Sequence, residues 1–272
     1  FDAAIAGDLK AIWIMGEDVA QTDPNTAHVI KALTNLDLLV VQEIFFTETA
    51  KLADVILPGA SFLEKNGTFT NGERRIQRVQ AVVPPLSGSK ADGDIMVEIM
   101  NRMGYQQPAY APGTMLEEIS RVVPFFAGVT WQNLGDHGLQ WPVLKGGVDT
   151  KILHSKDFKR GKGKFHYFDF EETTELLDNA ASFPFILTTG RNLEHYNAGT
   201  MTRRTHNAAI VDKDILLINP KDAKAKGIHT GDAARLFSDR GEVEIIVEVS
   251  KKIKPGVLFT TFHFPEFMVN NV

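Results

Sequence analysis

Three short apolar runs near the N-terminus alternate with a segment of helical character. The runs cover residues 10–15, 36–41 and 54–57, and between the first two the apolar residues of 29–33 recur at helical spacing. Asp23-Pro24 precedes that segment, as a cap residue followed by proline at the first helical position. Buried strands separated by a helix are typical of a parallel sheet with helical crossovers. We therefore expect the chain to open with a Rossmann-like α/β domain.

From residue 182 onward the pattern changes to short apolar strands separated by turns, with one short helix expected over residues 220–226. One of the expected strands is AAIV, residues 208–211. Many short strands with turn signals between them predict an all-β barrel. The chain has 272 residues, of which 43% are hydrophobic, enough for two cores of ordinary size. We expect two domains, residues 1–181 and 182–272.

The first of these domains ends in an irregular connector that begins at residue 105. Its KRGKGK run, residues 159–164, is interpreted as a solvated turn before an aromatic strand, FHYFDF, at residues 165–170. A contact between the basic run and a partner is the alternative.

Composition excludes several classes of function. With 29 basic and 34 acidic residues the formal net charge is -5, which gives no general attraction for nucleic acid. No apolar stretch reaches 18 residues, so direct membrane contact is not expected. The absence of cysteine excludes disulfides and thiolate metal ligands within these residues. The histidines at 137, 154 and 166 have no ligand-like spacing, and no metal site is assigned.

The segment TTGRNLEHYNAGTMTRR, residues 188–204, is the strongest candidate for a binding site. It follows an apolar strand and breaks at Gly190, a residue that permits positive φ and a close backbone approach to a ligand. Arg191, Arg203 and Arg204 lie in the segment with several amide, imidazole and hydroxyl groups. Such donors suit an anion with several oxygens, such as a diphosphate. The alternative is a solvated loop between strands.

A second group of candidates follows from the expected sheet. Ligands of parallel α/β sheets bind beyond the carboxyl ends of the strands, where the chain places Gly16 and Gln42-Glu43. An acid there can accept from ribose hydroxyls or guanine nitrogens, although Glu43 also fits an ordinary surface acid. The G-x-G-x-x-G fingerprint is absent, which disfavours a plain NAD site.

Lys65 and Asp92 each have two interpretations from their local sequence. Lys65 precedes Asn66-Gly67, a hairpin signal, so it can be a turn lysine. Asp92 precedes an apolar helical stripe that includes Met96 and Met103, so it can be an N-cap, and the methionines are interpreted as core.

Three stretches together resemble the molybdopterin oxidoreductase family. TGRNLEHYNAGTMTRR resembles the family's TGR-x-x-x-H-Y/W cofactor loop, and GTMTRR is most similar to the formate dehydrogenase branch. VVQEIFFTETAKLADVILPGASFLEKNGTFTNGERR resembles a stretch that meets the guanosine. INPKDAKAKGIHTGDAARLFSDRGEVEIIVEV resembles the C-terminal double-psi-type barrel. The resemblance implies a bis(molybdopterin guanine dinucleotide) cofactor with molybdenum or tungsten.

Residue by residue, the resemblance assigns contacts to both parts of the cofactor. On the guanosine side it implies Gln42, Glu43, Thr47, Lys65 and Asp92. On the pterin and diphosphate side it implies Thr189, Gly190, Arg191, Asn192, His195, Asn197, Phe262 and Asn270. For His195 a hydrogen bond to the pterin is preferred over a proton shuttle.

The implied activity is oxidation of formate to carbon dioxide. The chain begins at Phe1 without an initiator methionine, so we expect the C-terminal part of a longer catalytic subunit, inactive alone. The metal ligand and an iron–sulfur cluster are expected in the missing N-terminal part. Expected partners are that part and iron–sulfur electron-transfer subunits, in the cytoplasm or alternatively the periplasm. The alternatives are another molybdopterin oxidoreductase, such as a nitrate reductase, or a cofactor-less scaffold subunit of a respiratory complex.

Overall fold

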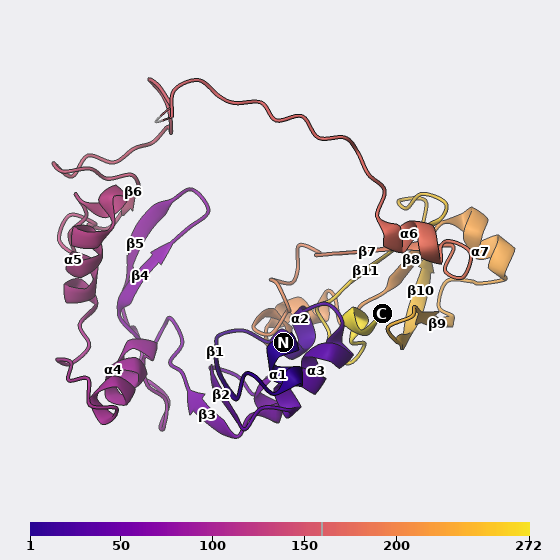
Figure 1. The fold of residues 1–272 in the computed structure, drawn as a ribbon, viewed down its shortest axis with the longest axis horizontal. Helices are drawn as coiled ribbons and strands as arrows, with labels where there is room; N and C mark the ends of the chain where they lie inside the picture. The colour runs from indigo at the N-terminus through magenta and orange to yellow at the C-terminus, as the bar shows by residue number, and fades with distance from the viewer. Residues whose placement is uncertain (159) are drawn as a thin grey trace. The chain divides into compact units, whose positions relative to one another are not determined.

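The computed structural model describes residues 1–158 and 160–272. Lys159, the first residue of the predicted KRGKGK turn, lies outside this range. The chain forms two compact units, one of Phe1–Ile56 with Asp169–Val272 and the other of Leu57–Phe168 (Figure 1). This division differs from the domain limits expected at 1–181 and 182–272, which stay a prediction. Within the described residues, no helix combines the length and apolarity needed to cross a membrane.

The N-terminal part of the first unit has the predicted alternation of strands and helices. Its strands form a sheet in the order β1-β2-β3, and β1 and β2 are parallel, with Met15 opposite Gln42. Ile14, Val29 and Leu39 belong to its apolar core. The elements are α1 (Asp2–Ala6), β1 (Ala11–Met15), α2 (Val19–Thr22), α3 (Thr26–Thr34), β2 (Leu38–Glu43), η1 (Ala50–Leu52) and β3 (Val55–Pro58), whose last two residues belong to the second unit.

The predicted start of α3 was wrong by two residues. The helix begins at Thr26, and its cap is the Asn25 side chain, which accepts from the backbone N–H of His28 at 3.3 Å. Asn25 adopts the left-handed conformation with φ 58°, which asparagine tolerates better than most residues. Asp23-Pro24 therefore lies before the cap and not in the first turn.

The C-terminal part of the first unit is built on a five-stranded mixed sheet in the order β7-β11-β8-β10-β9. β11 is parallel to β7 and antiparallel to β8, while β10 is parallel to β8 and antiparallel to β9. The predicted barrel stays a prediction beyond this sheet. The strands are β7 (Ile186–Gly190), β8 (Leu216–Ile218), β9 (Ala233–Phe237), β10 (Glu242–Val249) and β11 (Val257–Thr261).

The helices of this part include α7 (Pro220–Lys226), which has the predicted limits. The others are α6 (Thr174–Asn179), η3 (Thr202–Arg204), η4 (His206–Ala209) and η5 (Val269–Asn271). The strand predicted at 208–211 was wrong, because the Thr205 hydroxyl accepts from the N–H of Asn207 and starts a 3-10 turn there.

The second unit contains a sheet in the order β4-β5-β6 with two helices and one 3-10 turn. Its elements are β4 (Gly67–Thr70), β5 (Arg75–Val79), α4 (Asp92–Arg102), α5 (Pro112–Val122), η2 (Pro124–Phe126) and β6 (Leu139–Gln140). The hairpin turn lies at residues 71–74, where Arg74 adopts φ 69° and Asn71 N–H donates to Arg75 O at 3.0 Å. The Asn66-Gly67 hairpin signal was therefore misplaced, since Gly67 begins the first strand of the hairpin.

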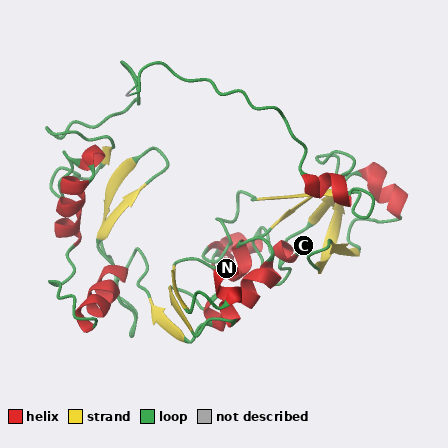
Figure 2. Cartoon of the chain, in the orientation of Figure 1, coloured by secondary structure: helices red, strands yellow, loops and turns green. Residues whose placement is uncertain are grey.

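Two predicted apolar features are exposed. Residues 165–170 are drawn as loop in Figure 2, and their Phe and Tyr residues are 82–100% exposed where a strand was predicted. Aromatic alternation favours a strand only where a neighbouring strand pairs with it. On α4, Met96 is 38% and Met103 is 81% exposed, while Ile95 is buried. The prediction that these methionines belong to the core was therefore wrong within this structure.

Gly190 closes β7 because there is no room for a side chain, and not because of its backbone conformation. Its φ is outside the positive range, so the positive φ that glycine permits is not adopted here. A Cβ at this position would lie 2.7 Å from Cε2 and 2.9 Å from Cζ of Phe259 on the adjacent strand. The absence of Cβ thus lets the two strand ends meet.

We expect Gly190→Ala to lower the free energy of unfolding by about 1–3 kcal/mol, the range for overpacking a well-packed site. Gly72→Ala is the control, because a Cβ there would have no atom within 4 Å. Urea unfolding of both variants measures the difference. Equal stability of the two variants would show that Phe259 gives way without cost.

Candidate functional site

The loop at residues 191–204 is held beside the C-terminal end of β11. Thr189 pairs with Thr260, and Gly190 with Thr261, in the parallel ladder between β7 and β11. The two strands therefore end at the same edge, and their continuations meet there. One continuation is the predicted binding loop, and the other begins with Phe262.

His263 connects the two continuations through both nitrogens of its ring. Its Nδ1 lies 2.6 Å from the carbonyl oxygen of Asn197, and its Nε2 lies 3.1 Å from the backbone nitrogen of Asn192. A carbonyl only accepts and an amide only donates, so Nδ1 carries the proton and the ring is neutral. The side chain of His263 is fully buried. Its pKa is lowered, chiefly because burial disfavours the charged form.

Asp214 supports the backbone at His263. Its fully buried carboxylate accepts from the Thr261 hydroxyl and from the backbone N–H groups of His263 and Phe264, at 3.2 and 3.0 Å for the latter two. Burial raises the pKa of Asp214, although the hydrogen bonds act in the opposite direction. The sequence prediction included neither Asp214 nor His263, because a single polar residue beside an apolar strand gives no motif.

His195 is also buried, and both of its ring nitrogens are engaged within the loop. Nε2 lies 2.8 Å from the carbonyl of Val211, and Nδ1 lies 3.0 Å from the hydroxyl of Thr202. The Thr202 hydroxyl also accepts from the N–H of Tyr196 at 3.2 Å. A hydrogen bond from this ring to a cofactor would replace one of these contacts. The predicted pterin contact of His195 stays a prediction.

The three arginines of the loop lie against aromatic rings and not against acids. The guanidinium carbons of Arg191, Arg203 and Arg204 lie 5.3, 5.9 and 4.4 Å from the ring centroids of Phe262, Phe264 and Phe45. In the described part of the chain, none of these guanidinium groups forms an ion pair within 4.0 Å.

Arg203 is the loop arginine with a buried nitrogen that has no acceptor in the described part of the chain. Its Nε is buried and has no hydrogen-bond partner among the described residues, and burial lowers the pKa of the guanidinium. A cation removed from water without a carboxylate is costly. The donor set therefore fits an anionic ligand such as a diphosphate, as the sequence predicted for this loop.

The residues predicted at the strand ends of the first sheet lie together. The N–H of Gly16 donates to the carbonyl of Gln42 at 2.9 Å, and Glu43 Oε1 accepts from the N–H of Ile44 at 2.7 Å. Thr47 is buried, and its hydroxyl accepts from the N–H of Ala50, the first residue of η1, at 3.2 Å, while Thr49 holds the cap position.

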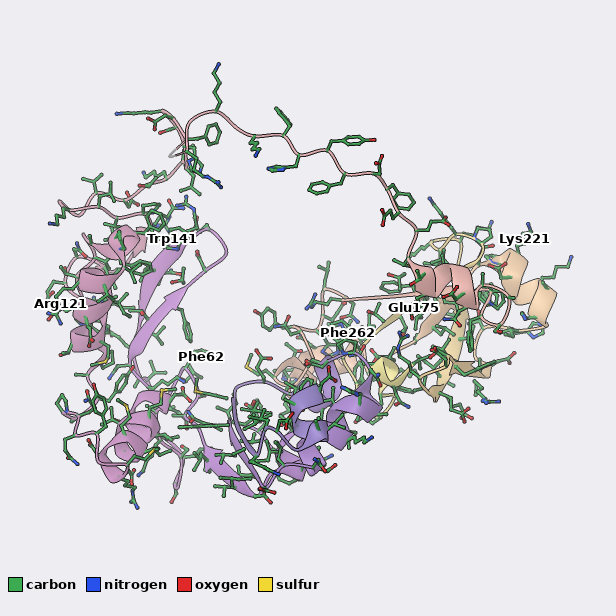
Figure 3. All side chains as sticks on the ribbon, in the orientation of Figure 1. Phe62, Arg121, Trp141, Glu175, Lys221 and Phe262 are labelled. Atoms are coloured by element: carbon green, nitrogen blue, oxygen red, sulfur yellow. The ribbon has the colours of Figure 1, made fainter. Side chains whose placement is uncertain are left out.

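Two amide side chains connect α2 to the loop and to the C-terminus. Asn270 Nδ2 donates to the carbonyls of Gln21 and Thr22 at 3.0 and 2.9 Å. Gln21 Nε2 donates to the carbonyls of Ala198 and Phe262 at 3.0 and 3.1 Å. Phe262 is half-buried and is labelled in Figure 3. Asn270 is thus engaged with the backbone of α2, and its predicted contact with a pterin stays a prediction.

In the second unit, Lys65 and Asp92 form an ion pair. Asp92 is the first residue of α4, and Ala91 holds the cap position without a side-chain bond, so the N-cap interpretation was wrong. A carboxylate in the first turn is favoured by the helix dipole. Both side chains border a cavity of about 260 Å³, and Lys65 also borders a larger one of about 890 Å³. The structure therefore brings these two predicted residues together.

Comparisons with known proteins identify what the chain is similar to. Residues 1–102 match the family model "Molybdopterin oxidoreductase", and residues 185–272 match "Molydopterin dinucleotide binding domain". The fold is similar to acetylene hydratase from Pelobacter acetylenicus, with a TM-score of 0.72, 22% identity, and coverage of 96% of this chain and 38% of that one.

Curated relatives are similar over nearly the whole chain. The F420-dependent formate dehydrogenase subunit alpha of Methanocaldococcus jannaschii is 42% identical over 95% of this chain and 39% of its own length. The F420-dependent formate dehydrogenase 2 subunit alpha of Methanococcus maripaludis is 41% identical over 97% and 40%. The chain thus spans about two fifths of the length of these relatives. It belongs to the molybdopterin oxidoreductase family, as its sequence motifs predicted.

We expect the stability of the protein to fall between pH 7.5 and 5.5 because of His263. Its folded pKa lies below the ordinary value of 6.5, so the unfolded chain binds the proton first as the pH falls. The loss is at most about 1.4 kcal/mol per pH unit for one proton. His263→Gln keeps a donor and an acceptor but does not titrate, so its urea-unfolding free energy should depend less on pH.

The variant retains Asp214, whose raised pKa also makes the free energy of unfolding depend on pH. This contribution acts at lower pH and has the opposite sign, because it decreases the stability as the pH rises. The difference between wild type and variant therefore isolates the histidine. If the unfolding free energies of the two proteins depended on pH in the same way, the neutral His263 ring between Asn192 and Asn197 would be contradicted.

We expect the coupling between Lys65 and Asp92 to be about 0.2–1 kcal/mol, because their side chains remain 23% and 35% exposed. A double-mutant cycle with Lys65→Met and Asp92→Asn, followed by urea unfolding, measures it. The Lys51–Glu48 pair, with side chains 51% and 23% exposed, is the reference cycle. A coupling above about 2 kcal/mol would assign the pair to the structural core.

Proposed function

We propose that this chain binds a bis(molybdopterin guanine dinucleotide) cofactor, with molybdenum or tungsten, in a formate dehydrogenase that oxidises formate to carbon dioxide. Support comes from the names of the relatives, which are formate dehydrogenase alpha subunits, and from the matched dinucleotide-binding model. The proposed contacts are the residues predicted from the sequence, together with the loop arginine Arg203.

The observation that carries the proposal is the group of loop arginines without carboxylate partners. Arg191 lies over Phe262, and Arg203 has a buried Nε without an acceptor. Two cations on one loop suit the two charges of a diphosphate, and the Phe262 ring offers a flat apolar surface beside them. A scaffold without cofactor has no need of an arginine whose Nε is buried without an acceptor.

The chain's own residues would bind and orient the cofactor, which supplies two-electron chemistry at its metal when bound. The neutral His263 ring and Asp214 hold the loop in one conformation, so little ordering remains to be done on binding. In the second unit, Lys65 and Asp92 would serve the guanosine. No residue of the chain is assigned a catalytic role.

The finer features of the fold and the assembly belong to the same proposal. The five-stranded sheet would form part of a double-psi-type barrel, and an iron–sulfur cluster would lie elsewhere in the protein. Partners would be the remainder of the catalytic subunit and iron–sulfur electron-transfer subunits. The proposed location is the cytoplasm, with the periplasm as the alternative.

We expect Arg191→Ala, in the protein expressed with its full reading frame, to lose bound cofactor and not only turnover. One charge-assisted hydrogen bond contributes about 1.5–3 kcal/mol, or roughly 10- to 100-fold in affinity. The measurements are metal content, pterin fluorescence after oxidation, and GMP released by hydrolysis. Arg235→Ala is the control, because Arg235 is paired with Glu242 and lies over the Phe237 ring. Wild-type cofactor content in Arg191→Ala would contradict the proposal.

A further inference from the structure

Gln21 is a buried residue with one half of its amide engaged by the protein. It lies on α2, its exposed fraction is 3%, and its Nε2 donates to two backbone carbonyls, those of Ala198 and Phe262. Because both neighbours are acceptors, a flipped amide would place Oε1 against two carbonyl oxygens. The orientation of the amide is therefore fixed by its partners.

The other half of the amide has no donor. Oε1 of Gln21 is buried and forms no hydrogen bond with any described residue. A buried acceptor left unpaired costs about 1–3 kcal/mol, so native proteins rarely retain one without a reason. Functional sites are where such exceptions are expected, because a ligand provides the missing partner.

Arg203 provides the complementary unpaired group in the adjoining part of the loop. Ala198 accepts from Gln21, and a Cβ on the next residue, Gly199, would lie 3.2 Å from Arg203 Nε and 2.9 Å from the carbonyl oxygen of His263. Gly199 also requires a φ of 73°. The backbone at 198–199 therefore adjoins both Gln21, with its unpaired acceptor, and Arg203, with its unpaired donor.

We propose that Gln21 and Arg203 contact the ligand of this site directly. Gln21 Oε1 accepts from an N–H group of an aminopyrimidinone ring, and Arg203 Nε donates to an oxygen of the same ligand. The proposal rests on the proposed function, since pterin and guanine both carry an aminopyrimidinone ring. It adds a role for α2, because the Gln21 amide that bonds the loop backbone would also bond the ligand.

The chemistry of the two ligand groups follows from the two protein groups. An amide oxygen accepts from neutral N–H groups, of which an aminopyrimidinone offers a ring N–H and an exocyclic amine. An arginine Nε prefers an anionic oxygen. A simple phosphate satisfies Arg203 but has no N–H for Gln21. The pair thus favours a ligand that contains both a heterocycle and charged oxygens.

Two substitutions at Gln21 separate its two functions. Gln21→Lys keeps donors for the carbonyls of Ala198 and Phe262 but has no acceptor. Gln21→Glu keeps an acceptor oxygen but loses the donors. Hydrogen exchange at the N–H of Arg203, which bonds the carbonyl of Gly199 at 2.8 Å, reports on the loop. Cofactor content, measured as pterin and GMP in the purified holoprotein, reports on the ligand.

We expect Gln21→Lys to lose about 2- to 12-fold in cofactor retention while exchange at Arg203 stays near wild type. Gln21→Glu should accelerate exchange at Arg203 more than it lowers retention. Arg203→Met should lower retention by about 10- to 100-fold. The control is Gln140→Lys, a buried glutamine of the second unit that donates to the Glu73 carbonyl.

A purely structural role of Gln21 predicts a different result. In both Gln21 variants, cofactor retention would then fall by an amount that follows the increase in hydrogen exchange at Arg203. That result, or wild-type retention in Gln21→Lys, would overturn the proposal. Wild-type protein without pterin or GMP would instead overturn the proposed function.

Melting of cofactor-free wild type and Gln21→Lys with GDP, and separately with neopterin, identifies the ring. If GDP raises the melting temperature of wild type but not of Gln21→Lys, and neopterin acts equally on both, the contacted ring is guanine. The reverse result assigns the contact to the pterin. Equal responses of the two proteins to both probes would overturn the contact.

Discussion

The neutral imidazole of His263 is the interaction on which the arrangement of the loop depends. It accepts from the N–H of Asn192 and donates to the carbonyl of Asn197, so one ring fixes the loop at two points. A charged ring would present a proton to the Asn192 N–H and break that contact. The burial that lowers the pKa of His263 therefore also keeps the loop closed near neutral pH.

Around this ring, some side chains of the loop are hydrogen-bonded within the protein, and the arginines are left without ion pairs among the described residues. His195 and Asn192 are engaged within the loop, whereas Arg191 and Arg203 form no ion pair within 4.0 Å in the described part of the chain. Preorganised donors reduce the ordering cost of binding, which is the usual reason for a rigid anion site. The division also explains how a loop rich in cations can be stable.

Much of the fold could be predicted from periodicity, as β1, β2 and α7 show, because repeated apolar positions report which face is buried. Periodicity could not locate the cap of α3 at Asn25 or the hairpin turn at residues 71–74, since both depend on single residues with positive φ. It also predicted a strand at residues 165–170, where the alternation is present but a pairing partner is not described.

The candidate loop was predicted because its donors are contiguous in the sequence. Gln21, Asp214 and His263 were missed because they are isolated polar residues, and only burial distinguishes them from surface residues. Asp92 illustrates the opposite case. Its position before an apolar stripe indicated a cap, whereas a lysine 27 residues away determines its contact.

The parallel pairing of β7 with β11 has a consequence for the synthesis of the protein. The ring of His263 reaches back 71 residues to Asn192, and Asn270 reaches back 249 residues to Gln21. Such contacts close late, because long loops must be ordered first. During translation these contacts therefore form only after residues 263 and 270 have been synthesised, so the loop stays without its buried ring until then.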